Sequence, residues 1–127
     1  MSLCLVANWK LNGSKEFNHQ WALEFFRNFH GQNFSFLGIA PASLFIDHLK
    51  GVIADHSIKI GAQNIDFEET GARTGEISAS MIKDLGCEFS IIGHSERRMY
   101  FHETNKLICQ KLIQANNNSL IPILCIG

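Results

Sequence analysis

A histidine stands at the end of an apolar run, in the segment Phe89-Ser90-Ile91-Ile92-Gly93-His94-Ser95-Glu96-Arg97-Arg98. The run before it is typical of a buried parallel strand, and the Ser-Glu pair after it is typical of a helix start. Such a junction is where α/β proteins place their chemistry. Because the positive end of a helix disfavours a proton on the ring, we expect His94 to be neutral. One ring nitrogen would accept a helix N–H and the other would carry the hydrogen. A histidine that merely caps a turn is the alternative interpretation.

An asparagine and a lysine lie at the end of the first apolar run, residues 3–9. In extended chain, residues i and i+2 share a face, so we expect Asn8 and Lys10 to point the same way. An ammonium group at the inner end of a strand is partly desolvated, which favours a nearby anion such as a phosphate or a developing oxyanion. A lysine that leans into the solvent is the alternative.

Further polar residues end the later predicted strands: Gln63 and Asn64 the third, and Cys125 the fifth. A rim of Asn, Lys, Gln and neutral His offers hydrogen-bond donors and one positive charge. That set suits an enolate-like or alkoxide oxygen beside an anionic group. No carboxylate is placed as a base, and we expect Glu96 to orient its neighbours or cap the helix. The first turn has neither GxGxxG nor Walker spacing, which disfavours a nucleotide-binding module.

Strands and helices that alternate must position these residues. The predicted strands cover residues 3–9, 34–40, 58–65, the run before Gly93, and 120–126. The predicted helices run from Ser14 to about 30, across 45–53, across 80–85 and from Thr104 to about 116, with Lys111 on the solvent face of the last. A short helix-capable segment follows His94. Residues 66–78 show no periodicity, and loops of that length tend to be functional.

This alternation predicts a parallel sheet with right-handed crossovers in a single domain, residues 1–127. Two architectures fit: a complete five-stranded doubly wound sheet of the flavodoxin kind, or the first part of an eight-stranded (β/α) barrel. In both, the carboxyl ends of the strands share one rim. Pairing of the first strand with the third would indicate the doubly wound sheet.

The composition excludes several classes of protein. Of 127 residues, 46% are hydrophobic and 18% charged, as in globular domains. A formal net charge of −1 gives no electrostatic case for nucleic acid. No apolar run approaches the ~20 residues of a membrane helix, and no signal-peptide pattern is present. The four cysteines lack metal-ligand spacing, and we expect them to be reduced and buried in a cytoplasmic protein.

Five segments resemble the triosephosphate isomerase family, in order and with its spacing, across essentially the whole chain: residues 7–13 (ANWKLNG), 61–64 (GAQN), 74–78 (TGEIS), 91–98 (IIGHSERR) and 123–127 (ILCIG). The resemblance implies a homodimeric (β/α)8 TIM barrel without a cofactor. Such an enzyme interconverts dihydroxyacetone phosphate and glyceraldehyde 3-phosphate through an enediolate, in glycolysis and gluconeogenesis. The family is well known for a neutral histidine that acts together with a carboxylate base.

The resemblance also implies roles for individual residues. His94 would be the catalytic electrophile that donates to the carbonyl and enediolate oxygens. Lys10 would supply positive charge to the phosphate and the transition state, and Asn8 would hydrogen-bond the substrate. The supporting residues would be Glu96, Gln63 and Cys125.

Residues 66–78 resemble the family's interdigitating dimer loop, with Thr74, Gly75 and Glu76 at the interface. Thr74 would reach Asn8 and Glu96 of a second copy. A mobile surface loop is the alternative.

Some features depart from the family pattern. His102 stands where glycine is common, and residues 41–43 differ from the usual wording. The family's catalytic glutamate, lid and main phosphate-gripping backbone would follow residue 127. We therefore expect residues 1–127 alone to be inactive, and to associate through open edges at the first and fifth strands. The alternatives are a free-standing α/β module that binds a phosphorylated ligand without catalysis, and a truncated chain with no function of its own.

Overall fold

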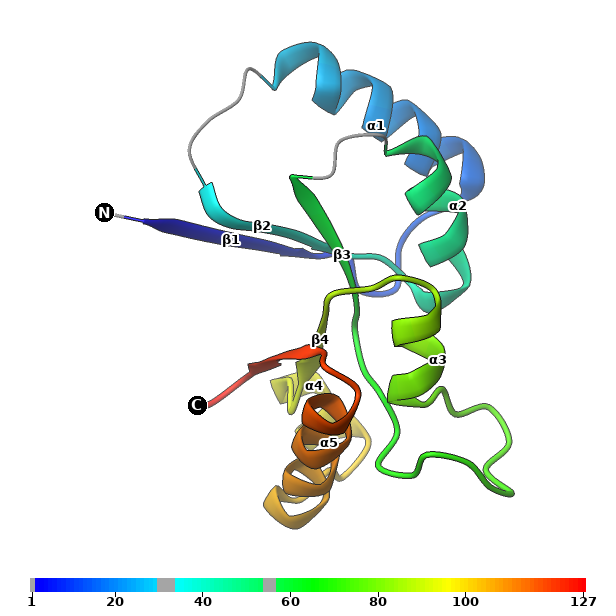
Figure 1. Ribbon diagram of the computed structural model, residues 1–127, viewed down its shortest axis with the longest axis vertical. Coiled ribbons are helices and arrows are strands. Elements are labelled where there is room, and N and C mark those ends of the chain that lie inside the picture. The colour runs from blue at the N-terminus through cyan, green and yellow to red at the C-terminus, as the bar shows by residue number, and fades with distance from the viewer. Residues whose placement is uncertain (1, 30–33, 54–56) are drawn as a thin grey trace.

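The computed structural model describes residues 2–29, 34–53 and 57–127. Five parallel strands form one curved sheet, and α1, α2 and α3 lie on one side of it (Figure 1). The strands are β1 (Leu3–Asn8), β2 (Phe34–Ala40), β3 (Ile58–Ala62), β4 (Phe89–Ile92) and β5 (Ile121–Leu124). Their order is β1-β2-β3-β4-β5, and each pairs in parallel with the next. The doubly wound alternative would pair β1 with β3 and is therefore wrong. The sheet is that of a partial (β/α)8 barrel.

Helices connect the strands. They are α1 (Lys15–Asn28), the 3-10 turn η1 (Ser43–Phe45), α2 (Ile46–Val52), α3 (Ala79–Asp84), α4 (Ser95–Tyr100) and α5 (Asn105–Asn117). Hydroxyl side chains cap three of them: Ser14 accepts the Phe17 N–H, and Ser78 and Thr104 do the same for α3 and α5. The predicted end of the first helix near residue 30 lies outside the described residues. The described part of α1 ends at Asn28.

Three strands are shorter than predicted, and the first of them by a single residue, since it ends at Asn8. The third strand ends at Ala62 and not at residue 65. The apolar run extends past the strand because Ile65 is fully buried in the core between the sheet and the helices. The fifth ends at Leu124 instead of residue 126, and Ile126 is largely exposed. Apolar character alone therefore overestimated the strand lengths.

A small apolar cluster around the ring of Phe89 lies on the concave side of the sheet. Phe89 is fully buried there, with Phe36 edge-on at a centroid distance of 5.5 Å. Gly61 on the adjacent β3 and Gly38 on β2 lie against this ring, and a Cβ on Gly61 would lie 2.5 Å from it. Glycine is thus required here by the close approach of the ring, because any side chain would collide with it.

The cysteines only partly follow the prediction. Cys87 is buried, and burial raises the pKa of its thiol to about 11. Cys4 and Cys109 are exposed, which corrects the expectation that they are buried. Cys4 lies on β1 at an outer position of the sheet, and Cys109 lies on the exposed face of α5. In the described ranges, no helix is both long and apolar enough to cross a membrane.

Candidate functional site

A cleft of about 780 Å³ opens where the strands end. Its lining comes from the loops after β1, β2, β3 and β4 and from the tip of the 66–78 loop, and includes Asn8, Lys10, Gln63, Asn64, Glu76, His94, Glu96, Arg97 and Tyr100. The cleft thus brings together most of the polar residues predicted for the rim. Cys125 is not among them, and packs against the cluster on the concave side of the sheet.

His94 occupies the junction between β4 and α4. Gly93 turns the chain with φ of +71°, and His94 is the N-cap residue of α4. Its Nδ1 accepts the Glu96 backbone N–H at 3.2 Å, as expected from the sequence. A nitrogen that accepts carries no hydrogen, so the hydrogen of the neutral ring is on Nε2. Glu96 Oε2 also lies 3.5 Å from Nδ1, but the occupied lone pair there leaves no N–H to donate to it.

Lys10 reaches the cleft by an unusual backbone conformation. The first strand ends at Asn8, so Lys10 is outside the strand and the alternation of side chains along a strand does not apply to it. The φ of Lys10 is +54°. Asn8 Oδ1 accepts the Lys10 N–H at 3.0 Å. Gln63 Nε2 donates to the carbonyl oxygens of Lys10, at 2.9 Å, and Ala40, at 3.0 Å. A left-handed lysine costs roughly 1–2 kcal/mol, and such strain concentrates at functional sites. Asn8 and Gln63 hold it in place.

A carboxylate neutralises the ammonium group of Lys10. Nζ lies 2.6 Å from Glu96 Oε1, with the two side chains 51% and 41% exposed. The hydrogen bond from Lys10 holds the pKa of Glu96 below its ordinary value. Lys10 was expected to be partly desolvated and to seek an anion. It is instead half exposed, and the anion it meets is Glu96.

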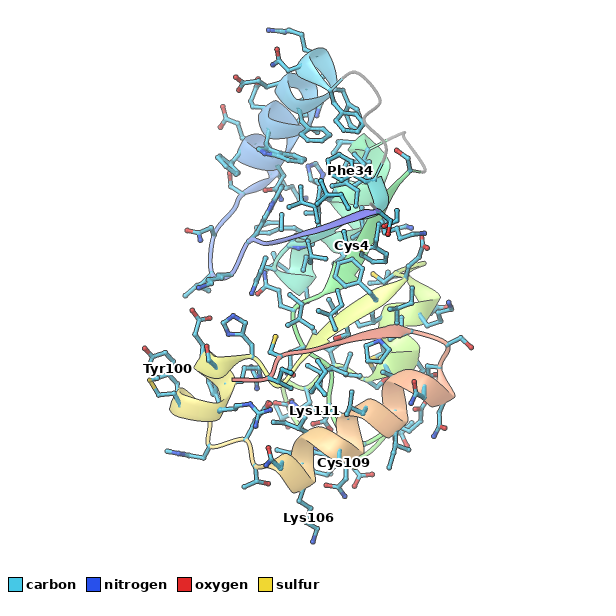
Figure 2. All side chains as sticks on the ribbon, turned by 90° about the vertical axis from the view of Figure 1, so that its left-hand side faces the viewer. Cys4, Phe34, Tyr100, Lys106, Cys109 and Lys111 are labelled. Atoms are coloured by element: carbon cyan, nitrogen blue, oxygen red, sulfur yellow. The ribbon has the colours of Figure 1, made fainter. Side chains whose placement is uncertain are left out.

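A buried ionic cluster lies behind the cleft and was missed from the sequence. Lys111 is 2% exposed, although the predicted helix placed it on the solvent face. Its Nζ donates to Glu103 and, at 2.7 Å, to Asn64 Oδ1, while Arg97 Nε lies 2.6 Å from Glu103 Oε1. Figure 2 shows Lys111 between α5 and the strands, whereas Lys106 points away. One signal was present: Lys111 is three residues after Ile108 and four before Ala115, and both of these are buried.

The protonation of this cluster follows from burial and pairing. Burial lowers the pKa of Lys111. Burial acts to raise the pKa of Glu103, but the hydrogen bonds from Lys111 and Arg97 outweigh it and leave that pKa below its ordinary value. Glu103 therefore stays ionised at neutral pH, and the cluster links Arg97, at the cleft, with α5.

The 66–78 loop is closed at its base. Asp66 N–H donates to the Ile77 carbonyl at 2.8 Å, and Arg73 forms a two-point ion pair with Asp66 while its guanidinium lies 4.1 Å from the Phe67 ring centroid. The hydrogen bond from Arg73 lowers the pKa of Asp66. These contacts present an exposed tip at Thr74, Gly75 and Glu76.

The donors of the cleft do not form a metal site. Within residues 2–29, 34–53 and 57–127, no group of three or more His, Cys, Asp or Glu side chains is arranged to hold a metal ion. The described cleft therefore offers hydrogen-bond donors and one ammonium group, with its nearest carboxylate already paired.

Known proteins match this chain over almost all of its length. The sequence profile of the triosephosphate isomerase family matches residues 3–127. The chain is 42% identical over 124 residues to the triosephosphate isomerase of Baumannia cicadellinicola subsp. Homalodisca coagulata, and 42% identical over 123 residues to that of Escherichia coli O139:H28. Each match covers 97% of this chain and 48% of the relative. The chain thus spans about half the length of the curated relatives it matches.

Proposed function

Since this chain belongs to the triosephosphate isomerase family, we propose that the protein containing it interconverts dihydroxyacetone phosphate and glyceraldehyde 3-phosphate. The observation that carries the proposal is that Lys10 and His94 line one cleft and both lie against the carboxylate of Glu96. One small anionic substrate can therefore meet an ammonium group and an imidazole N–H together.

In the proposed reaction a proton leaves one carbon of the triose and returns to its neighbour through an enediolate. The Nε2–H of His94 donates to the oxygen that becomes negative, which stabilises the charge as it develops. The ammonium group of Lys10 attracts the phosphate, and its ion pair with Glu96 is replaced by one with the phosphate. Asn8 uses Oδ1 on the Lys10 N–H, so its Nδ2 is available to hydrogen-bond the substrate.

The base is proposed to come from outside the described cleft. Glu96 is bound to Lys10 and its pKa is lowered, and a carboxylate of low pKa is a poor proton acceptor. We therefore propose that residues 1–127 position and polarise the substrate, while the family's glutamate and lid lie elsewhere in the protein. A general base contributes about 10²–10⁴ in rate, so a polypeptide of these residues alone should turn over no substrate.

The assembly and location of the protein follow the family in this proposal. Residues 1–127 would be the amino-terminal part of one (β/α)8 domain in a cytoplasmic homodimer. The exposed tip at Thr74, Gly75 and Glu76 would contact a second copy, where Thr74 would approach Asn8 and Glu96.

The test is isomerase activity of the protein expressed from its complete coding sequence in a host that lacks its own isomerase. His94→Gln should lower kcat by about 10²–10⁴, because the donor to the developing oxyanion is lost. The matched control is His19→Gln on the exposed surface of α1, which should have wild-type kcat. An inactive wild-type protein, or an unaffected His94→Gln variant, would contradict the proposal.

A further inference from the structure

The guanidinium group of Arg98 joins three segments that meet beside His94. Its Nε donates to the Gly93 carbonyl at 2.7 Å, its Nη2 to the Cys125 carbonyl at 3.1 Å, and its Nη1 to Asn105 Oδ1 at 2.7 Å. Gly93 lies in the turn after β4, Cys125 directly follows β5, and Asn105 is the first residue of α5. One side chain thus fastens together the ends of two strands and the start of a helix.

The contact with Gly93 is close. Gly93 has φ of +71°, and a Cβ at this position would lie 3.1 Å from Arg98 Nη2. The guanidinium therefore packs directly against the turn that precedes His94. The hydrogen bond from Cys125 N–H to the Ile92 carbonyl, at 2.9 Å, continues the pairing of β4 with β5 up to this point. Arg98 binds the carbonyl groups that follow.

Both peptide groups that flank His94 are held by hydrogen bonds, one from the helix backbone and one from the Arg98 side chain. The carbonyl of His94 accepts the N–H groups of Arg97, at 2.9 Å, and Arg98, at 3.1 Å, within the first turn of α4. The carbonyl of Gly93, on the other side, accepts the Arg98 side chain. Since these two peptides set the direction of the Cα–Cβ bond of His94, the Arg98 side chain holds one of the two peptide groups on which the position of Nε2 depends.

We propose that Arg98 is a positioning residue: it orients the imidazole of His94 toward the cleft by binding the Gly93 and Cys125 carbonyls. The inference rests on the proposed function, because it assigns Arg98 a part in the isomerase reaction. Arginine is required because its planar fork donates in several fixed directions, whereas the single ammonium of a lysine cannot reach three separate acceptors.

The test compares Arg98→Met and Arg98→Lys with the matched control Arg27→Met, which makes the same change on the exposed surface of α1. The protein is expressed from its complete coding sequence. A displacement of about 1 Å at a reacting group costs about 10²-fold, so both Arg98 variants should lose about 10- to 100-fold in kcat with a smaller change in KM. The ¹⁵N resonances of the His94 ring should also move from the pattern of one fixed tautomer toward a mixture. Arg27→Met should change neither.

A second variant separates positioning from folding. Asn105→Ala removes one acceptor and leaves the Gly93 and Cys125 bonds, so a folded protein with a smaller kcat loss and a ring signature shifted in the same direction is expected. Wild-type kcat and ring spectrum in Arg98→Lys or Arg98→Met would overturn the inference, as would a loss of stability with no change at His94. If the wild-type protein lacks isomerase activity while the Arg98 variants still alter the ring spectrum, the proposed function fails and the positioning of His94 stands.

Discussion

The ammonium nitrogen of Lys10 lies 2.6 Å from Oε1 of Glu96, which joins the loop after β1 to the first turn of α4. The pair joins two segments that line the cleft and lie 86 residues apart in sequence. An anion that enters the cleft therefore competes with a carboxylate already in place. When an anion binds at this site, it replaces Glu96 as the partner of the Lys10 ammonium group.

Replacement of Lys10 by methionine should abolish most of the activity. A unit charge at ~4 Å in a medium of effective dielectric ~20 contributes about 4 kcal/mol, which corresponds to roughly 10³-fold in kcat/KM. The matched control is Lys106→Met, because Lys106 points into the solvent (Figure 2). Steady-state kinetics at several salt concentrations measure the effect. Equal loss in both variants would show that the charge of Lys10 acts only at long range.

Replacement of Glu96 by glutamine should strengthen the binding of inorganic phosphate. Exposed ion pairs are weak, so the freed ammonium of Lys10 should lower the dissociation constant by only up to about fivefold, and only at low salt. Isothermal titration calorimetry measures the constant, with Glu16→Gln on the exposed start of α1 as the control. Weaker phosphate binding in Glu96→Gln would mean that the carboxylate orients Lys10 more than it competes for it.

The buried cluster should govern stability in acid. The pKa of Glu103 is lower in the folded protein than its ordinary value of 4.5, so its stabilisation is present above that pH and is lost as the pH falls through the lower folded value. Glu103→Gln should cost about 3–5 kcal/mol near neutral pH, since Lys111 keeps a buried charge without its partner. The variant should also lose less stability than the wild type between neutral pH and pH ~3. Urea unfolding across this range tests both expectations, and parallel curves would contradict the second.

The packing of Phe89 should make Gly61 intolerant of a side chain. Gly61→Ala brings a methyl group within 2.5 Å of the ring and should destabilise the fold by about 1–3 kcal/mol or more. Adding Phe89→Leu should recover part of this loss. Gly51→Ala is the control, because its Cβ meets nothing within 4 Å in α2 and should stabilise the helix by about 0.5–1 kcal/mol. Thermal unfolding measures all three, and additive losses in the double variant would exclude the steric explanation.

Local patterns predicted the elements better than their arrangement. The order of strands and helices and the starts of the first and last helices, at Ser14 and Thr104, follow from short-range chemistry, and the structure confirms them. The choice between a doubly wound sheet and a partial barrel depends on which strands pair. Tertiary packing decides that pairing, and the hydrophobic pattern within a single segment gives no information about it.

The candidate site shows the same division. Asn8, His94 and Glu96 were identified by their position at the ends of predicted elements, and the cleft brings them together. Lys10 was identified by strand alternation, but it reaches the cleft through a left-handed backbone that depends on the distant Gln63.

The burial of Lys111 and the backbone conformation of His102 were not predicted from short segments. Lys111 lies at helical spacing from the buried Ile108 and Ala115, but a lysine is assigned to the polar face of a helix unless its partner, here Glu103, is known. His102, where the family often has glycine, has φ of +55°, a conformation that glycine adopts without strain.

The hydrogen bond from the Glu96 amide to His94 Nδ1 makes the chemistry of the ring depend on the integrity of a single helical turn. When the start of α4 frays, the imidazole regains the freedom to carry its hydrogen on either nitrogen, and a molecule in that state has a donor aimed the wrong way for part of the time. Amide hydrogen exchange at Glu96 would therefore measure the fraction of molecules in which the ring is held in one tautomer. Substitutions that loosen this turn would lower that fraction.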